Sequence, residues 1–368
     1  MRVLIFTSSG GTAHDAAAYA LRDWCAQLRP GVEVRVDAVL ENASWFTRGG
    51  TDVYNWIQKH APWLHQLYWR IVELEDLIKP GTVLFGHRYL VRLLREYRPD
   101  VLISTHPHTN RGHFDLAKRV LGSQLRCITS CTEVDGGFGF SRNWVSRRAD
   151  LFWTLTPGVD RELHRRRFPR ERVRCLGPLL YPAFHQAPAP LDLPAGLPLL
   201  VLGSGANGAN NHIRLLEQLL PQAGRLRVIA LCGRRASAQQ KVEQWASQHH
   251  QLAVEALGFQ GPEQMAELYR CAWALVARPG ARTATEALAM GCPLIFNRYG
   301  LTMPQELLAP RWFRAHGLEV SICRPRQLAA VVARWLDEPE AYQNLRATYA
   351  RHRLSSDPEA LLEALIGG

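Results

Sequence analysis

The chain has 368 residues, of which 47% are hydrophobic and 21% are charged, and it carries a net charge of +11. This length suffices for two domains of ordinary size, and the balance of apolar and charged residues excludes a disordered or a fibrous protein. The sequence has no apolar run of about eighteen residues and no signal peptide, which predicts a cytoplasmic protein without a membrane-spanning helix.

Strand-forming runs alternate with longer helical patterns along the whole chain. Ten short runs predict strands, at residues 2–6, 33–38, 101–105, 126–131, 151–154, 199–202, 227–231, 254–257, 272–276 and 293–296. Such alternation is typical of parallel sheets covered by helices. The ten strands fall into two groups of five. We therefore predict an α/β protein with two Rossmann-like, doubly wound domains that face each other across a cleft.

The stretch between the two groups of strands predicts a linker. Residues 182–198 contain five prolines, which disfavour both a helix interior and a central strand. We therefore expect an N-terminal domain at 1–183, a stiff linker at 184–198 and a C-terminal domain at 199–368.

Three residues that follow predicted strands of the N-terminal domain are suited to acid–base chemistry. His14 comes after the loop glycines Gly10 and Gly11, at the start of a helix, whereas His106 follows the third predicted strand and Glu133 the fourth. Ligands of open α/β sheets bind at the carboxyl ends of strands, so each of the three can line a site. Alternatives stay open: hydrogen-bonded packing for His106, a surface acid for Glu133, and loop capping or phosphate binding for His14.

The interval 42–98 departs from the alternation because it is rich in aromatic residues. Trp56, Trp63 and Tyr68 are spaced along one broad helical face, and Trp69 lies beside them. An amphipathic basic segment with such aromatics can lie in the interface of a bilayer and meet a lipid there. The same stripe can equally form part of a buried core, and the sequence leaves both alternatives open.

The positive charge is concentrated in the first half of the chain, with +8 over residues 1–183 and +3 over 184–368. Basic clusters lie at 88–98, 142–148 and 161–174. Anionic lipid and nucleic acid would both attract them, and a solvated basic face explains them equally well. No nucleic-acid partner is expected, because no recognised module is present. The cysteines lack the spacing of a zinc site, and neither a metal nor a cofactor is expected.

The C-terminal domain has the layout of a nucleotide-sugar site. Gly203 follows the sixth predicted strand and Gly280 the ninth, each where a helix begins. The N–H groups and the positive dipole end of a helix can hold a diphosphate there. Glu286, one turn further, can accept both hydroxyls of a ribose, and Gln305 and Glu306 after the last predicted strand suit the hydroxyls of a sugar. The predicted donor site also includes Ser204, Gly205, Arg282 and Thr283.

Further motifs complete this pattern: Ser104-Thr-His-Pro107, Gly177-Pro-Leu-Leu-Tyr-Pro-Ala-Phe184, Cys232-Gly-Arg234 and Leu257-Gly-Phe259. In type and order, the motifs resemble the monogalactosyldiacylglycerol synthase group of glycosyltransferases and, more distantly, the lipid-linked N-acetylglucosaminyltransferases of peptidoglycan synthesis. The resemblance covers most of the chain and implies the GT-B architecture. It also implies that His14 activates the acceptor, that the aromatic segment faces a lipid, and that Arg234 and Phe259 form the wall that binds uridine.

We therefore expect an inverting, metal-independent glycosyltransferase that moves a hexose from a UDP-sugar to a lipid hydroxyl, with diacylglycerol as the expected acceptor. It would bind peripherally to an anionic membrane surface. A UDP-sugar epimerase of the same fold is one alternative. A non-catalytic donor-binding subunit is another, because the loop has Thr and Ala before His14 where relatives have glycines. If His14 is the base, its ordinary pKa of about 6.5 predicts activity that rises through neutral pH.

Overall fold

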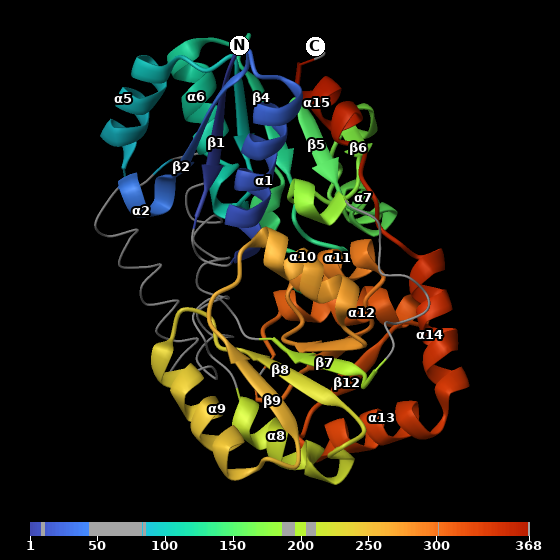
Figure 1. Ribbon diagram of the computed structural model, residues 1–368. Helices are drawn as coiled ribbons and strands as arrows, with labels where there is room; N and C mark the ends of the chain where they lie inside the picture. The colour runs from blue at the N-terminus through green and yellow to red at the C-terminus, as the bar shows by residue number, and fades with distance from the viewer. Residues whose placement is uncertain are drawn as a thin grey trace. The chain divides into compact units, whose positions relative to one another are not determined.

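The computed structural model describes residues 1–8, 12–43, 83, 86–185, 196–203, 211–300 and 302–366. The chain divides into two compact units (Figure 1). The first comprises Met1–Pro182, Met303–Leu308 and Ser355–Gly368, and the second comprises Ala183–Thr302 and Ala309–Leu354.

The first unit is built on a six-stranded parallel sheet. Its strands are β1 (Arg2–Thr7), β2 (Glu33–Ala38), β3 (Val101–Ser104), β4 (Arg126–Ser130), β5 (Leu151–Thr154) and β6 (Val173–Cys175), in the order β2-β1-β3-β4-β5-β6. The chain moves outward from β1 to β2 and then returns to place β3 on the other side of β1. This reversal makes the carboxyl ends of β1 and β3 the topological switch point, where open sheets of this kind bind ligands.

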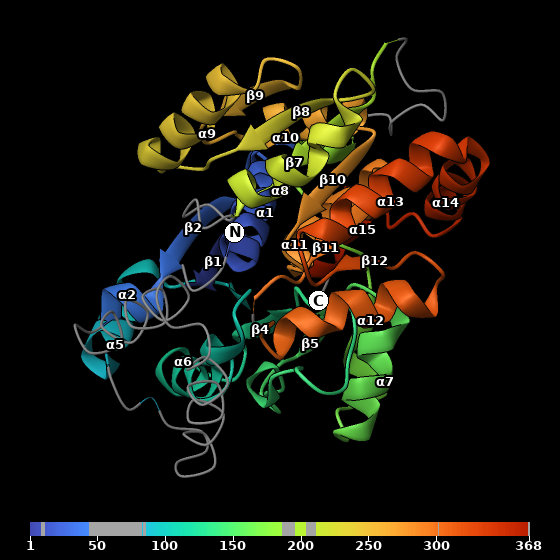
Figure 2. The same ribbon diagram turned by 90° about the horizontal axis from the view of Figure 1, so that it is seen from below.

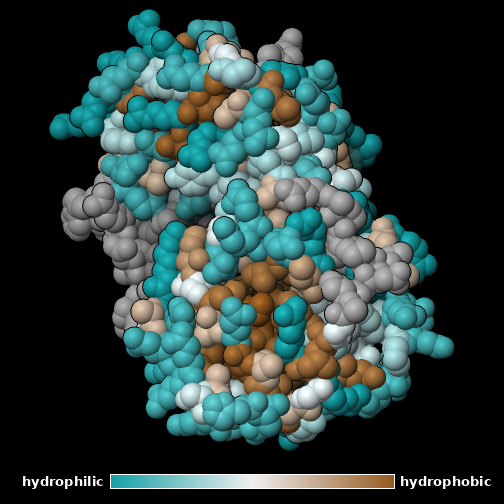
Figure 3. All heavy atoms as spheres, viewed as in Figure 1, coloured by the Kyte–Doolittle hydropathy of each residue, from teal (hydrophilic) through white to brown (hydrophobic). Residues whose placement is uncertain are grey.

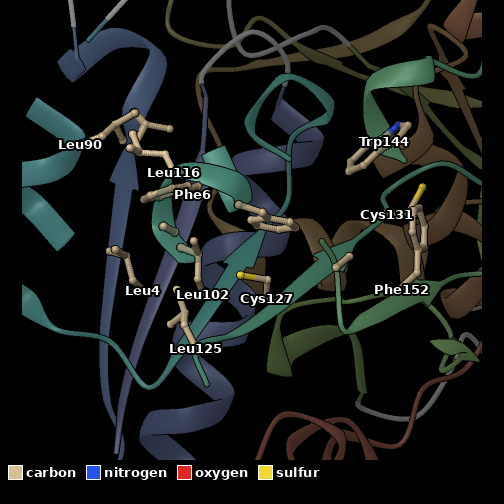
Figure 4. Close-up of a cluster of buried hydrophobic side chains, with 14 of the residues drawn as sticks. Leu4, Phe6, Leu90, Leu102, Leu116, Leu125, Cys127, Cys131, Trp144 and Phe152 are labelled. Carbon is tan, nitrogen blue, oxygen red and sulfur yellow. The ribbon is translucent and has the colours of Figure 1, made fainter. Parts of the chain in front are cut away.

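Helices cover both faces of the first sheet because its strands are apolar on both sides. On β1, Leu4 and Phe6 belong to one buried cluster, whereas Val3 and Ile5 belong to another. The first cluster, shown in Figure 4, lies under α5 (His87–Tyr97), α6 (His113–Leu121) and α7 (Pro157–Arg165). The second lies under α1 (Thr12–Leu28) and α15 (Pro358–Ile366). In Figures 1 and 2, α5 and α6 lie side by side, and the short α2 (Val39–Ala43) follows β2.

The second unit repeats this plan. Its strands are β7 (Leu199–Leu202), β8 (Arg227–Leu231), β9 (Ala253–Leu257), β10 (Ala274–Ala277), β11 (Leu294–Asn297) and β12 (Val320–Ile322), in the order β12-β11-β10-β7-β8-β9. All paired strands are parallel. The switch point of this sheet therefore lies between β7 and β10.

The helices of the second unit pack on its sheet in the same layered way. α8 (His212–Leu219), α9 (Ala236–Gln248) and α13 (Arg326–Asp337) share one buried cluster with alternate residues of β7 and β8. The other helices are α10 (Pro262–Cys271), α11 (Ala281–Met290), α12 (Leu308–Ala315) and α14 (Pro339–Arg351). In Figure 3, apolar side chains gather around β8, whose Ile229 and Leu231 face away from the α8 and α9 cluster. No helix within the described ranges is long and apolar enough to cross a membrane.

The ten strands predicted from the sequence are all present, each within two residues of its expected ends. The prediction of five strands in each domain is wrong, because β6 and β12 complete sheets of six. Both missed strands have only three residues and lie at the edge of their sheet. A run of three residues is too short to show an alternating pattern, so its pairing with a neighbour defines it.

Two segments from beyond residue 300 belong to the first unit, whereas the sequence analysis placed everything after 198 in the C-terminal domain. Residues 303–308 approach the chain at Gly139, and 355–366 approach it at Gly177. Both glycines have positive φ angles, and a Cβ on either would collide with the carbonyl oxygen of Pro304 or of Ser355. Residues 355–366 pack on the first unit because the buried leucines of α15 complete its hydrophobic core beside α1.

Candidate active site

His14 lies at the switch point of the first sheet and is positioned by three strands. It occupies the first turn of α1, just after β1. Its Nδ1 is 2.8 Å from the carbonyl oxygen of Thr105, which directly follows β3. The hydroxyl oxygen of Thr132, beyond β4, is 3.2 Å from the same nitrogen. One imidazole is thus held against the ends of β1, β3 and β4.

These contacts determine which ring nitrogen of His14 carries the proton. A carbonyl oxygen can only accept a hydrogen bond, so Nδ1 must be the protonated nitrogen that donates to Thr105. In a neutral ring with its proton on Nδ1, the lone pair lies on Nε2. No residue in the described part of the chain forms a hydrogen bond with Nε2. When the ring is neutral, this second nitrogen can accept a proton.

The surroundings of His14 lower its pKa. Desolvation by the surrounding protein is the largest cause and brings the pKa to about 4, with the hydrogen bond to Thr105 opposing the shift and the charge of His108 adding to it. The expectation of an ordinary pKa near 6.5 is therefore wrong for this residue. Neighbouring elements partly desolvate a ring that the sequence alone places after two loop glycines, at the start of a helix.

His106 and Trp144 line the same imidazole. The rings of His106 and His14 meet edge to face, with centroids 4.5 Å apart, and the Trp144 ring is 5.8 Å from His14. His106 is buried, and the backbone N–H of His108 donates to its Nδ1 at 3.3 Å. Burial, then the nearby histidine charges, hold the pKa of His106 well below its usual range. Among the described residues, no His, Cys, Asp or Glu group is arranged to hold a metal ion.

Glu133 follows Thr132 in the loop after β4 and forms no hydrogen bond with His14. The contact from its loop comes from the preceding residue, Thr132. No described residue forms a hydrogen bond or an ion pair with the Glu133 carboxylate, and burial raises its pKa to about 8. A carboxyl group with this pKa is mostly protonated at neutral pH, so it is a weaker candidate for a base than His14.

In the second unit, a glycine follows each of the two strands that flank the switch point. The N–H of Gly203, after β7, donates to the carbonyl oxygen of Val276 in β10 at 2.7 Å. A Cβ on Gly203 would lie 3.1 Å from the Cβ of Ala277, so a side chain there would crowd the neighbouring strand. Gly280 is the N-cap of α11, and no side chain caps it. The first N–H groups of α11, including that of Thr283, have no partner within the helix and can bind an anion.

Glu286 is buried in α11 and is already held by two neighbours. Its Oε1 accepts a bond from Nε of Arg282 at 2.7 Å, and its Oε2 accepts one from the Tyr269 hydroxyl at 3.1 Å. Tyr269 comes from α10 and is itself buried. The carboxylate therefore forms part of the packing between α10 and α11, in addition to any role at a ligand.

Arg234 and Phe259, which the sequence analysis paired, do lie together. They follow β8 and β9, which are neighbouring strands, and the Arg234 guanidinium lies 4.3 Å from the centroid of the Phe259 ring. Half of the Phe259 surface is exposed. An exposed aromatic ring against a guanidinium is a surface on which a flat base can stack.

Comparison with known proteins identifies the kind of enzyme. Residues 14–179 match the family described as monogalactosyldiacylglycerol (MGDG) synthase, and residues 204–353 match glycosyl transferases group 1. The chain is a glycosyltransferase with the GT-B fold. The predicted fold class and the predicted resemblance are thereby confirmed.

This glycosyltransferase is similar to a processive diacylglycerol beta-glucosyltransferase of Bacillus pumilus, with 23% identity over 99% of this chain and 94% of that protein. In structure it is similar to MurG of Acinetobacter baumannii, with a TM-score of 0.63 and 16% identity over 100% of this chain and 99% of that one. It is also similar to UDP-GlcNAc 2-epimerase of Neisseria meningitidis, with a TM-score of 0.60 and 12% identity over all of both chains. The two structural similarities concern the fold.

Gln305 and Glu306 do not lie in the second unit of the glycosyltransferase, where the sequence analysis placed them. They belong to the segment 303–308, which groups with the first unit. Glu306 is buried, and one of its carboxylate oxygens accepts a bond from the backbone N–H of Met303 at 2.9 Å. Eight further predicted site residues lie outside the described residues: Gly10, Gly11, Ser204, Gly205, Trp56, Trp63, Tyr68 and Trp69.

Sequence reasoning missed Thr105, Thr132 and Tyr269 in this glycosyltransferase. The two threonines position His14, and the tyrosine holds Glu286. The two threonines could have been found from their position, because each is a polar residue that follows an apolar strand, the third or the fourth. For Tyr269 there was no signal, because an aromatic residue in an amphipathic helix predicts core packing.

Proposed function

We propose that this glycosyltransferase moves a hexose from a UDP-sugar to the hydroxyl of diacylglycerol at a membrane surface. The observation that carries the proposal is the state of His14, a neutral imidazole that donates from Nδ1 and has a lone pair on Nε2. Deprotonation of an acceptor hydroxyl requires such a group. The lipid acceptor is supported by the MGDG synthase family match and by the name of the Bacillus relative.

The second unit would bind the donor. The base of the nucleotide would stack on the surface formed by Arg234 and Phe259, and its ribose hydroxyls would reach Glu286. The diphosphate would lie at the N-terminus of α11, against the N–H groups that follow Gly280. Arg234, Phe259 and the N-terminus of α11 each follow a strand of the same sheet, and parallel strands end together at one edge.

The chemistry would be a single displacement. Nε2 of His14 would take the proton of the acceptor hydroxyl while the hydroxyl oxygen attacks the anomeric carbon, and UDP would leave from the opposite side. Such a displacement inverts the anomeric configuration. The α11 N-terminus and Arg282 would stabilise the negative charge that develops on the departing diphosphate, so the proposal does not require a divalent ion.

Association with an anionic membrane is part of the proposal. It is supported by the concentration of positive charge in residues 1–183. Each basic residue near an anionic surface contributes about 1 kcal/mol of attraction. Gln305 and Glu306 would contact the sugar, and His106 would line the acceptor side next to His14.

The test is to incubate the purified protein with radiolabelled UDP-glucose or UDP-galactose and with vesicles that contain diacylglycerol. We expect labelled glycolipid, and more of it when the vesicles contain anionic lipid. If labelled lipid never forms with any UDP-hexose, the proposal is wrong.

The second candidate is a UDP-sugar epimerase, because the chain is similar in fold to a UDP-GlcNAc 2-epimerase. The same assay without vesicles tests it. An epimerase would change the sugar of the donor without an acceptor, whereas the proposed transferase would leave the donor largely intact. Activity of the purified protein alone on vesicles would also exclude a non-catalytic subunit.

A further inference from the structure

The contact between Arg282 and Glu286 covers the carboxylate that the proposed function assigns to the ribose. The two residues are four apart on α11, and their side chains form an ion pair at 2.7 Å. The Glu286 side chain is 4% exposed, whereas that of Arg282 is 25% exposed. The other partner of the carboxylate, Tyr269, is only 2% exposed. Of the three groups, Arg282 is the one that stands toward the solvent.

A ligand that reaches Glu286 must therefore compete with Arg282. The Tyr269 hydroxyl can stay in place, because Tyr269 is buried and bonds to Oε2, whereas Arg282 bonds to Oε1 and is the partner on the solvent side. Moving the guanidinium away from a buried carboxylate is unfavourable unless the guanidinium finds a new anionic partner. Arg282 lies two residues beyond Gly280, in the first turn of α11, where the helix favours an anion. A diphosphate bound there would supply that partner, and an uncharged nucleoside would not.

We propose, on the basis of the proposed function, that Arg282 makes the site selective for nucleoside diphosphates over nucleosides. In the empty site Arg282 pairs with Glu286. A diphosphate at the start of α11 draws the guanidinium to itself and leaves Glu286 for the ribose hydroxyls. A nucleoside alone must break the ion pair without replacing it, so it binds poorly.

The experiment measures the affinities of UDP and uridine by calorimetry for the wild type and for Arg282→Met. We expect the variant to bind UDP about tenfold more weakly, the loss expected for one charge-assisted hydrogen bond. It should bind uridine more tightly than the wild type, because uridine no longer has to displace Arg282 from Glu286. Arg282→Lys, which keeps the charge, should retain most of the preference for UDP. The matched control is Arg334→Met on α13, which breaks an exposed ion pair of the same spacing with Glu338 and should change neither affinity.

Three outcomes would overturn the inference. One is an equal loss of UDP and uridine affinity in Arg282→Met, which indicates a purely structural residue. Another is a UDP affinity unchanged by that substitution. The third is a wild type that binds uridine as tightly as UDP. This result would contradict the selectivity proposed for Arg282 but not the proposed transferase function. A wild type that binds no UDP at all would instead overturn the proposed function, and this inference with it.

Discussion

Replacement of His14 by alanine should lower kcat by about 10²–10⁴-fold, the usual contribution of a general base, with the affinity for UDP nearly unchanged. The pH dependence of the wild type gives a sharper test, because His14 and Glu133 have pKa values shifted in opposite directions, to about 4 and about 8. The value of kcat/KM follows the ionisation of groups in the free enzyme.

The two pKa values lead to very different profiles. With His14 as the base, roughly nine tenths of the enzyme already has an unprotonated imidazole at pH 5, so kcat/KM should be nearly constant from pH 5 to 8. With Glu133 as the base, only about one molecule in a thousand has an ionised carboxylate at pH 5, against half at pH 8. In that case kcat/KM would rise by roughly 500-fold over the same range.

The assay is the initial rate of glycolipid formation between pH 5 and pH 8.5, at constant ionic strength and with vesicles of uncharged lipid. Glu133→Gln is the control and should keep the flat profile of the wild type. A steep rise toward pH 8 that Glu133→Gln abolishes, or a kcat for His14→Ala within a few-fold of the wild type, would refute the assignment of His14 and identify Glu133 as the base.

Three further predictions concern stability. Burial lowers the pKa values of His14 and His113 to about 4, so the unfolded chain binds protons below about pH 6.5 that the folded chain does not. Their contribution to stability is complete above pH 6.5 and should fall toward pH 4, by at most about 1.4 kcal/mol per pH unit for each histidine, less for their partial exposure. The raised pKa of Glu133 acts in the opposite direction over this range, so the measurement uses Glu133→Gln, and equal urea midpoints of that variant at pH 7 and pH 5 would contradict the prediction. Tyr349→Phe removes a buried hydroxyl that accepts a hydrogen bond from the Leu294 N–H at 2.8 Å. The free energy of unfolding, measured with urea, should fall by about 1–3 kcal/mol, whereas the control Tyr19→Phe at the surface should leave it almost unchanged. Leu362→Ala should cost about 2–5 kcal/mol if α15 completes the core of the first unit, with the exposed Glu363→Ala as its control; a loss no greater than that of the control would show that α15 is not part of that core.

Sequence alone determined the elements and the residues at their ends. Ten of the twelve strands are readable because each is a run of apolar residues bounded by turn formers, a pattern that nearby residues determine by themselves. The placement of His14, Gly280, Arg234 and Phe259 after strands follows from the same local pattern. Parallel strands end at one edge of a sheet, so a candidate site could be proposed there before any pairing of strands was known.

The tertiary structure decided what those residues can do. The contacts of His14 with Thr105 and Thr132 join residues 91 and 118 positions apart, and they determine its tautomer, whereas the burial of its ring lowers its pKa. The ion pair between Arg282 and Glu286 is local to one helix, but its burial depends on Tyr269 from another. The strand order, the three-residue strands β6 and β12 and the return of α15 to the first unit likewise depend on partners far along the chain. The pKa of a side chain and its hydrogen-bond partners depend on all residues that surround it in space, and the sequence alone does not show which residues those are.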